Sequence, residues 1–306
     1  MNEAQFLKNL EVPKGKIDIV LDTDAFNEVD DQFAISYMLK SPKKFNVKGI
    51  CAAPFLNTRS SSALDGMEKS YNEILKLLEL MEMPNLSEIV YKGSSNFLKD
   101  EQTPEQSDAA EFLANLANDY TPEKPLYIVS IGAITNVASA MLKNPKMREN
   151  TVIIFLGGRA RGTVNPACEF NMKQDIAAAR VVFSSGVPLI QIAGKGVTDR
   201  LLTTKPELEY WLRGKNKLCD YLCENVIEEA EAHKTGKAWS RVIWDTVAIA
   251  WFFNENGKWL EEIIIPAHIP EYDLTYSFDA ARHKMKYIEW VERDAIFTHL
   301  FETLAK

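Results

Sequence analysis

Short apolar runs alternate with amphipathic segments along most of the chain. The apolar runs, rich in Ile and Val, lie at 16–21, 45–53, 126–131, 151–156 and 187–193, and helical periodicities lie at 31–40, 60–82, 107–119, 134–143 and 172–184. Apolar runs unbroken by charge are typical of strands buried on both faces, as in a parallel sheet. The alternation therefore predicts an α/β fold, with an open, doubly wound, mostly parallel sheet flanked by helices.

Length and pattern together predict one domain, residues 1–306. A chain of 306 residues, 46% of them apolar, can bury a large core. Beyond the last of these runs the pattern becomes mostly helical, which we interpret as a helical insertion around 197–254. Two further strands, at 261–270 and 284–291, and a closing helix complete the expected order.

Composition and charge argue against several kinds of partner. Nucleic acids and anionic membranes select basic surfaces, whereas the net charge here is −8. No apolar stretch approaches the ~18 residues of a spanning helix, and the N-terminus lacks the continuous apolar run of a signal peptide. Cys219 and Cys223 share a helix face, but no second Cys/His pair completes a zinc site. We therefore expect reduced thiols in a cytoplasmic protein.

The stretch from Asp22 to Asp31, DTDAFNEVDD, holds five acidic residues in ten positions directly after the first predicted strand. Ligands of open parallel sheets bind beyond the carboxyl ends of the strands. A helix N-terminus favours a carboxylate by only ~0.3–1 kcal/mol, too little to offset repulsion among several converging carboxylates. This predicts a hard divalent cation held by oxygen ligands, Ca²⁺ or Mg²⁺. The alternative is a solvated loop whose carboxylates diverge and cap the following helix.

Polar residues also follow other predicted strands. Asn57 follows the second strand, and Glu169 and Asn171 follow the strand at 151–156 in the segment GGRARGTVNPACEFN. Asp245 begins an apolar helix in WDTVAIAW. Because the carboxyl ends of parallel strands meet at one edge of a sheet, these groups are expected near the acidic stretch.

Four motifs in this order resemble those of the nucleoside hydrolases, whose best-known branch is the inosine–uridine-preferring N-ribohydrolases. They are the DxD followed by DD after the first strand, ITNVASA, EFNMKQDIAAARVVFSSGVPL and WDTVAIAW. The resemblance runs from about residue 16 to the C-terminus, and the EFN block is its most specific part. It implies Ca²⁺-dependent hydrolysis of the N-glycosidic bond of a nucleoside or related riboside, by a homo-oligomer (dimer or tetramer).

The resemblance also implies roles for individual residues. The Ca²⁺ ligands would be Asp24, Asp31, the backbone carbonyl of Ile131, and Asp245. Asp24 would also act as the general base on the water that attacks C1′ of the ribose. Asp22 is interpreted as a structural support of the loop.

Substrate contacts are implied for a second group of residues. Asp30 would hold the ribose 2′-hydroxyl, and Glu169 and Asn171 the 5′- and 3′-hydroxyl side. Asn57 would correspond to the family's asparagine after the second strand. The base side would be lined by Trp244, in a position where the inosine–uridine branch often has His; an indole there resembles the purine-preferring branch and can stack on a base, although core packing is the alternative.

Further departures concern the loops. The usual signature, D-P-G-x-D-D, has three residues between the first ligand and the acidic pair, whereas here AFNEV separates them. Its Glu28 has no counterpart, and either points to solvent or reaches the pocket rim. The asparagine expected shortly before the EFN block is replaced by Thr163 or displaced to Asn165. Arg159 and Arg161 near the pocket mouth either are solvated or paired, or accept an anionic group of the substrate.

Phe97, Trp239 and Arg241 are possible rim residues. All four histidines lie outside the motifs, so imidazole general-acid catalysis is not expected.

Two other functions remain open at this point. A riboside-binding protein that has lost turnover would keep the same fold. A Mg²⁺-dependent phosphatase of the haloacid-dehalogenase type also has DxD after its first strand, but leaves EFN and WDT without a role. A dinucleotide-binding oxidoreductase is less well supported, because no G-x-G-x-x-G follows a strand.

Overall fold

Eight strands form one central sheet, described here from a computed structural model of residues 1–306. They are β1 (Ile17–Thr23), β2 (Phe45–Ala52), β3 (Val90–Lys92), β4 (Leu126–Ser130), β5 (Thr151–Leu156), β6 (Leu189–Ile192), β9 (Leu260–Pro266) and β12 (Lys284–Val291). Their order is β3-β2-β1-β4-β5-β6-β12-β9. All neighbours are parallel except β12 and β9, which pair antiparallel. The predicted mostly parallel sheet is confirmed.

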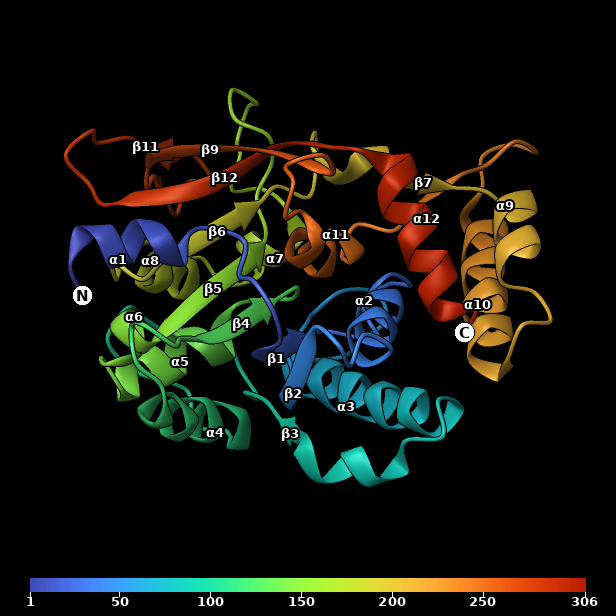
Figure 1. Cartoon of the computed structure of the whole chain (residues 1–306), viewed down its shortest axis with the longest axis horizontal. Helices are drawn as coiled ribbons and strands as arrows, with labels where there is room; N and C mark the ends of the chain where they lie inside the picture. The colour runs from blue at the N-terminus through green and yellow to red at the C-terminus, as the bar shows by residue number, and fades with distance from the viewer.

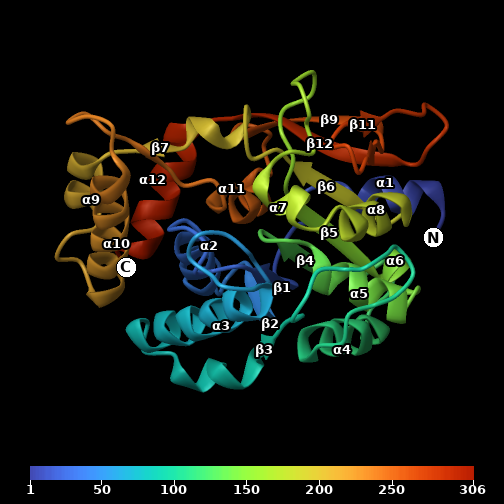
Figure 2. The ribbon, with the colours of Figure 1, turned by 180° about the vertical axis from the view of Figure 1, so that it is seen from behind.

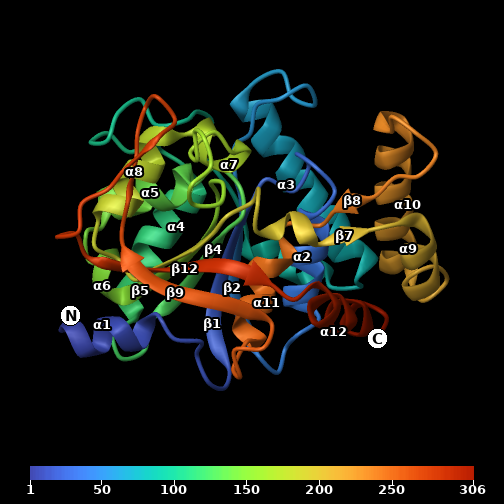
Figure 3. The same cartoon turned by 90° about the horizontal axis from the view of Figure 1, so that it is seen from above.

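Helices cover both faces of the sheet. They are α1 (Glu3–Asn9), α2 (Asp31–Leu39), α3 (Ala63–Leu80), α4 (Asp108–Leu116), α5 (Thr135–Lys143), α6 (Met147–Asn150), α7 (Phe170–Gln174), α8 (Ile176–Ser184), α9 (Lys205–Trp211), α10 (Lys217–His233), α11 (Thr246–Ala250) and α12 (Arg293–Leu304). Helices α2, α3, α11 and α12 pack together on one face, and α4, α5 and α8 on the other (Figures 1 and 3). Every residue of β4 and β5 is buried, as expected for strands covered on both sides.

Two expected elements have different boundaries in the structure. The helix predicted at 172–184 is divided into α7 and α8 at Asp175, whose carboxylate accepts hydrogen bonds from the backbone N–H of Ala178 (2.9 Å) and of Leu98 (2.8 Å). The strand predicted at 261–270 ends at Pro266, and Ala267 N–H makes the last hydrogen bond to the partner segment, to the His283 carbonyl (2.8 Å). The next two residues to pair, in β10 (Ile269–Pro270), join β11 (Tyr276–Ser277) in a separate small sheet.

Between residues 197 and 254 the chain is largely helical. Helices α9 and α10 lie at the end of the molecule farthest from α1 (Figures 1 and 2). Before and after them, β7 (Leu202–Thr203) and β8 (Arg241–Val242) pair antiparallel and return the chain to the sheet. None of the helices combines the length and the apolar composition that crossing a bilayer requires.

The strand order creates one crevice suited to a ligand. β1 pairs with β2 on one side and with β4 on the other, so the connections after β1 and after β4 leave in opposite directions. In open α/β sheets, ligands bind at such a switch point, outside the carboxyl ends of the strands. The loops after β1, β4, β5 and β6 are therefore the segments that build the site.

Candidate active site

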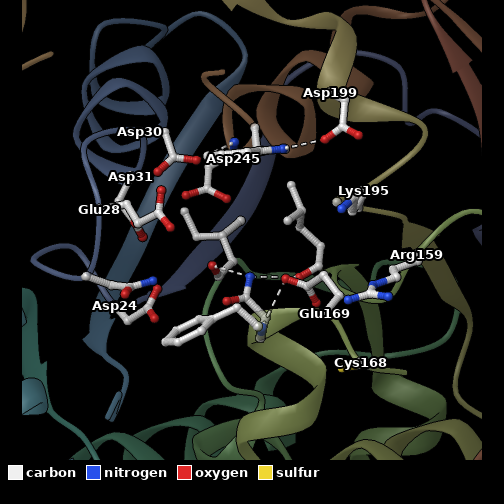
Figure 4. Close-up of a pocket in the computed structure, with 17 residues that line it drawn as sticks. Asp24, Glu28, Asp30, Asp31, Arg159, Cys168, Glu169, Lys195, Asp199 and Asp245 are labelled. Atoms are coloured by element: carbon white, nitrogen blue, oxygen red, sulfur yellow. Dashed lines mark hydrogen bonds between the residues drawn. The ribbon is translucent and has the colours of Figure 1, made fainter. Parts of the chain in front are cut away.

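A polar cavity of about 310 Å³ opens at the carboxyl ends of the central strands (Figure 4). Eight of the nine residues predicted for the site line it: Asp24, Asp30, Asp31, Ile131, Glu169, Asn171, Trp244 and Asp245. The ninth, Asn57, does not. The cavity has the size of a small-ligand pocket, at the lower end of the usual ~300–1,000 Å³.

Three carboxylates converge at one side of this cavity. Asp30 and Asp31 stand at the start of α2, and Asp245 stands directly before α11, which packs against α2. One carboxylate oxygen of each lies within 4.8 Å of the others. The backbone N–H of Asp245 donates to Asp30 Oδ2 (3.3 Å), and the Thr23 hydroxyl donates to Asp31. Residues more than two hundred positions apart thus form one acidic group.

Asp24 lies beside this group, at the end of β1. Its Oδ2 is buried without a hydrogen-bond partner, and its Oδ1 lies so close to Gly132 that an added Cβ there would be 2.9 Å away. The backbone carbonyl of the adjacent Ile131 accepts a hydrogen bond from Asn171 Nδ2 (2.9 Å), which leaves its second lone pair unused. An orphaned carboxylate oxygen, a carbonyl and three further carboxylates are the oxygen donors that a hard divalent cation requires. The residues present fit such an ion.

The electrostatics of the cluster also favour a bound cation. Burial, followed by repulsion from Asp31, raises the pKa of Asp30 to about 7, and burial raises the pKa of Asp31 to about 6. For Asp24 and Asp245, burial and then the neighbouring carboxylates raise the pKa well above its ordinary value. A bound divalent cation opposes each of these shifts, because it favours the ionised carboxylates.

Asp22 takes no place in the cavity. Its carboxylate accepts hydrogen bonds from Asn136 Nδ2 (2.8 Å) and from the Ser130 hydroxyl (3.0 Å), which ties the end of β1 to β4 and α5. These bonds oppose the effect of complete burial, which raises the pKa of Asp22 to about 7. Asp22 therefore supports the loop after β1 from outside the cavity, the structural role that its sequence position suggested.

Glu28, which has no counterpart in the usual motif, lines the cavity instead of pointing away from it. It forms an ion pair with Arg241, from β8. Burial raises the pKa of Glu28 to about 7, Asp30 adds to the effect, and Arg241 opposes it. The Arg241 guanidinium also lies 5.5 Å from the ring of Trp244, so this arginine connects the first loop with the Trp244 side of the cavity.

The EFN segment forms the opposite wall of the cavity. The Glu169 carboxylate caps α7 by accepting backbone N–H groups of Asn171 (3.0 Å) and Met172 (3.2 Å), and it accepts a third from Gly158 (2.8 Å). Both hydrogens of the Asn171 side-chain amide go to backbone carbonyls, one of them that of Ile131. The Asn171 Oδ1 is therefore left to accept a hydrogen bond from a ligand.

Asn57 does not reach the cavity, because Asn27 lies between the two. Its Nδ2 donates to Asn27 Oδ1 (2.6 Å), and Asn27 lines the cavity in its place. The signal for Asn27 was its position inside the acidic stretch, between the two groups of carboxylates. Neither Thr163 nor Asn165 lines the cavity, because both lie in an exposed part of the loop after β5.

Several other lining residues were not predicted. Trp244 donates its Nε1–H to Asp199 Oδ1 (3.1 Å), which places an acidic residue next to the indole. Further lining residues outside the prediction are Cys168, Phe170, Gly194 and Lys195. Of the two arginines near the mouth, Arg159 lines the cavity. The possible rim residues Phe97 and Trp239 do not line it.

Together the fold and the cavity define an α/β enzyme with a carboxylate site suited to a divalent cation. Residues 19–285 match the sequence model of a family described as inosine-uridine preferring nucleoside hydrolase. The chain belongs to this family. The predicted family and the predicted class, a hydrolase of N-glycosyl bonds, are thereby confirmed.

Named relatives cover most of the chain. A probable uridine nucleosidase of Arabidopsis thaliana is 28% identical over 222 residues, 67% of either chain. A pyrimidine-specific ribonucleoside hydrolase of Salmonella enteritidis is 28% identical over 260 residues, 76% of this chain and 78% of its own.

Solved structures share the fold. A plant nucleoside hydrolase superposes with a TM-score of 0.76 at 20% identity, covering 94% of this chain and 99% of its own. A purine-preferring ribonucleoside hydrolase from Gardnerella vaginalis gives a TM-score of 0.71, also at 20% identity, over 94% and 98%. The relatives carry both pyrimidine and purine names, so base preference does not follow from them.

Proposed function

We propose that this protein hydrolyses the N-glycosidic bond of a ribonucleoside in a Ca²⁺-dependent reaction that releases the base and ribose. The observation that carries the proposal is the convergence of Asp24, Asp30, Asp31 and Asp245 in a cavity at the switch point of the sheet. Membership of the nucleoside hydrolase family supports the same reaction. The relatives named for uridine and pyrimidine ribonucleosides support a nucleoside as the substrate.

The proposed ligands of the ion are Asp24, Asp31, Asp245 and the carbonyl of Ile131. Bound Ca²⁺ would supply a chelation point for the ribose diol and acidify the attacking water. Ca²⁺ is favoured over Mg²⁺ because ligands drawn from three separate loops suit its flexible coordination by six to eight oxygens.

The remaining steps belong to the side chains. Asp24 accepts the proton of the water that attacks C1′, and its unpartnered Oδ2 is available for that proton. Asp30 holds the 2′-hydroxyl, while Glu169 and Asn171 hold the 5′- and 3′-hydroxyl side. Bond cleavage develops positive charge on the ribosyl ring, as in glycoside hydrolysis, and the surrounding carboxylates stabilise that charge.

Trp244 is proposed to form one face of the base site. Its ring is only partly buried and lines the cavity, so a base can stack on it. No histidine lines the cavity, so departure of the base does not use an imidazole of the chain. A cytoplasmic location and a dimeric or tetrameric assembly stay predictions.

The test is release of reducing sugar from a panel of ribonucleosides, with Ca²⁺ and after chelation. We expect release only with Ca²⁺, and a loss of at least ~10³-fold in the Asp24→Asn variant, the scale of general-base catalysis combined with a lost ion ligand. Calcium binding without any sugar release would favour the riboside-binding alternative. Release of phosphate from simple phosphomonoesters would instead favour the phosphatase.

A further inference from the structure

Two cationic residues line the side of the cavity away from the carboxylate cluster (Figure 4). Arg159 follows β5, and Lys195 follows β6. The two are partners in a parallel bridge that extends the pairing of these strands, with Ala160 N–H donating to the Lys195 carbonyl (2.7 Å). The backbone therefore holds the two cations next to one another.

Neither residue has a counter-ion within the chain. No ion pair involves Arg159 or Lys195, and the Arg159 Nε–H is buried without an acceptor. By contrast, Arg161 is exposed and pairs with Glu289 (3.5 Å). The carboxylate of Glu169, on the same wall, is already held by three backbone N–H groups. A buried donor without an acceptor is costly, so Arg159 is suited to a ligand that brings the acceptor.

The backbone links both cations to Glu169. Gly158, directly before Arg159, donates its N–H to this carboxylate (2.8 Å). Gly194, directly before Lys195, packs on the same side chain: a Cβ added there would lie 3.3 Å from Glu169 Cγ. Arg159 and Lys195 thus flank the residue proposed to hold the 5′ end of the ribose.

From this arrangement we propose that the preferred substrate is a nucleoside 5′-monophosphate, with Arg159 and Lys195 binding its phosphate. The proposal rests on the proposed function and specifies its substrate class. Water adds to C1′, the bond to the base breaks, and the products are the base and ribose 5-phosphate; the phosphoester is untouched. The planar guanidinium can bind two phosphate oxygens at once, and the ammonium group adds a point charge.

An anionic group on the base would have the same chemistry but a different position. The base side is lined by Trp244, whose indole N–H donates to Asp199. A carboxylate on the base would lie near this acidic residue and be repelled by it. At the 5′ position the Glu169 carboxylate also repels a phosphate, but its charge is offset there by three backbone N–H groups and by Arg159 and Lys195, which have no other counter-ion. The distribution of charge therefore favours the 5′ position.

The experiment compares kcat/KM of the Ca²⁺-loaded protein for uridine, inosine, their 5′-monophosphates, and orotidine, whose base carries a carboxylate. We expect the monophosphates to be preferred at least about tenfold, the effect of one charge-assisted hydrogen bond. Arg159→Gln and Lys195→Gln should each lower the ratio of kcat/KM for the monophosphate to kcat/KM for the nucleoside about tenfold. Arg161→Gln, the matched control, should leave the ratio unchanged.

Several outcomes would overturn the inference while leaving the proposed function intact. These are faster cleavage of the unphosphorylated nucleosides, a ratio unchanged in both variants, or a preference for orotidine. If nothing is cleaved, the proposed function fails, and calorimetric titration with ribose 5-phosphate then decides the inference. Binding that is weakened about tenfold by Arg159→Gln or Lys195→Gln would support the phosphate site, and equal binding by all variants would exclude it.

Discussion

Calcium should stabilise this protein much more at pH 7.5 than at pH 5. Burial raises the pKa of Asp30 from 3.8 to about 7. A carboxyl group with a raised pKa binds its proton more tightly in the folded state, so without a cation the free energy of unfolding falls between pH 4 and pH 7. At 1.36 kcal/mol per unit, this shift of ~3 units corresponds to a loss on the order of 4 kcal/mol above pH 7.

A bound cation offsets much of this loss. Calcium at a hundred times its Kd adds ~2.7 kcal/mol to the free energy of unfolding. With an unfolding entropy of ~2.1 cal/mol/K per residue, the Tm of this 306-residue chain should rise by ~4 °C. At pH 5 the shift should be much smaller, because protons compete with the ion for the carboxylates.

The assay is thermal unfolding of chelator-treated protein at both pH values, with and without added Ca²⁺. Asp245→Asn should abolish the calcium response at pH 7.5 and raise the Tm of the calcium-free protein, because an amide avoids the cost of burying a carboxyl group whose pKa is raised well above its ordinary value. Glu289→Gln, at an exposed ion pair with Arg161, should respond like the wild type. A calcium shift of equal size at the two pH values, or one retained by Asp245→Asn, would refute the reasoning.

Three further variants test other parts of the site. Gly132→Ala places a Cβ 2.9 Å from the Asp24 carboxylate, the proposed general base, and should lower kcat ~100-fold. The control Gly236→Ala, which has open space around it, should keep the wild-type kcat. Equal kcat values for the two variants would show that the added methyl group does not displace Asp24. Trp244→Ala should raise KM at least ~5-fold, and Trp244→Phe much less, if the indole stacks on the base. At pH 8, Arg241→Gln should lower the Tm more than Glu28→Gln, because only the first leaves an unpaired carboxylate in the cavity; equal losses would show that the ion pair does not neutralise Glu28.

The sheet and the acidic half of the site follow from the sequence because both depend on local pattern and topology. Buried parallel strands need continuous apolar runs, such as TVIIFL in β5. The carboxyl ends of β1 and β4 meet at the switch point, which brings Asp24 and Ile131 together. The acidic stretch alone indicated Asp24, whereas Ile131 was predicted only from the family resemblance. The polar start of the helix at Asp245 suggested a place near the acidic stretch, but its role as an ion ligand required the family motif, because its distance along the chain gives no local indication of contact.

Features set by side-chain contacts between loops were not accessible in this way. Asn27 and Asn57 are both amides near the strand ends, and only their hydrogen bond decides which of them faces the cavity. Lys195 lies in AGKGVTD, a segment without motif character, and it reaches the site because β6 is paired with β5. The break between α7 and α8 depends on contacts of Asp175 with Leu98 and Thr135, which come from distant parts of the sequence.

The longer loop AFNEV acquires a physical role from these contacts. Its Asn27 lines the cavity and accepts a hydrogen bond from Asn57. Its Glu28 forms an ion pair with Arg241 and is not one of the proposed ligands of the ion. The ion pair joins residues 213 positions apart and ties β8 to this loop, with the guanidinium 5.5 Å from the Trp244 ring. A tighter Pro-Gly turn would offer no carboxylate to anchor Arg241 there. The extra residues of the loop therefore act on the Trp244 side of the cavity. Because Trp244 is proposed to line the base site, substitutions of Glu28 should change base preference more than they change calcium binding.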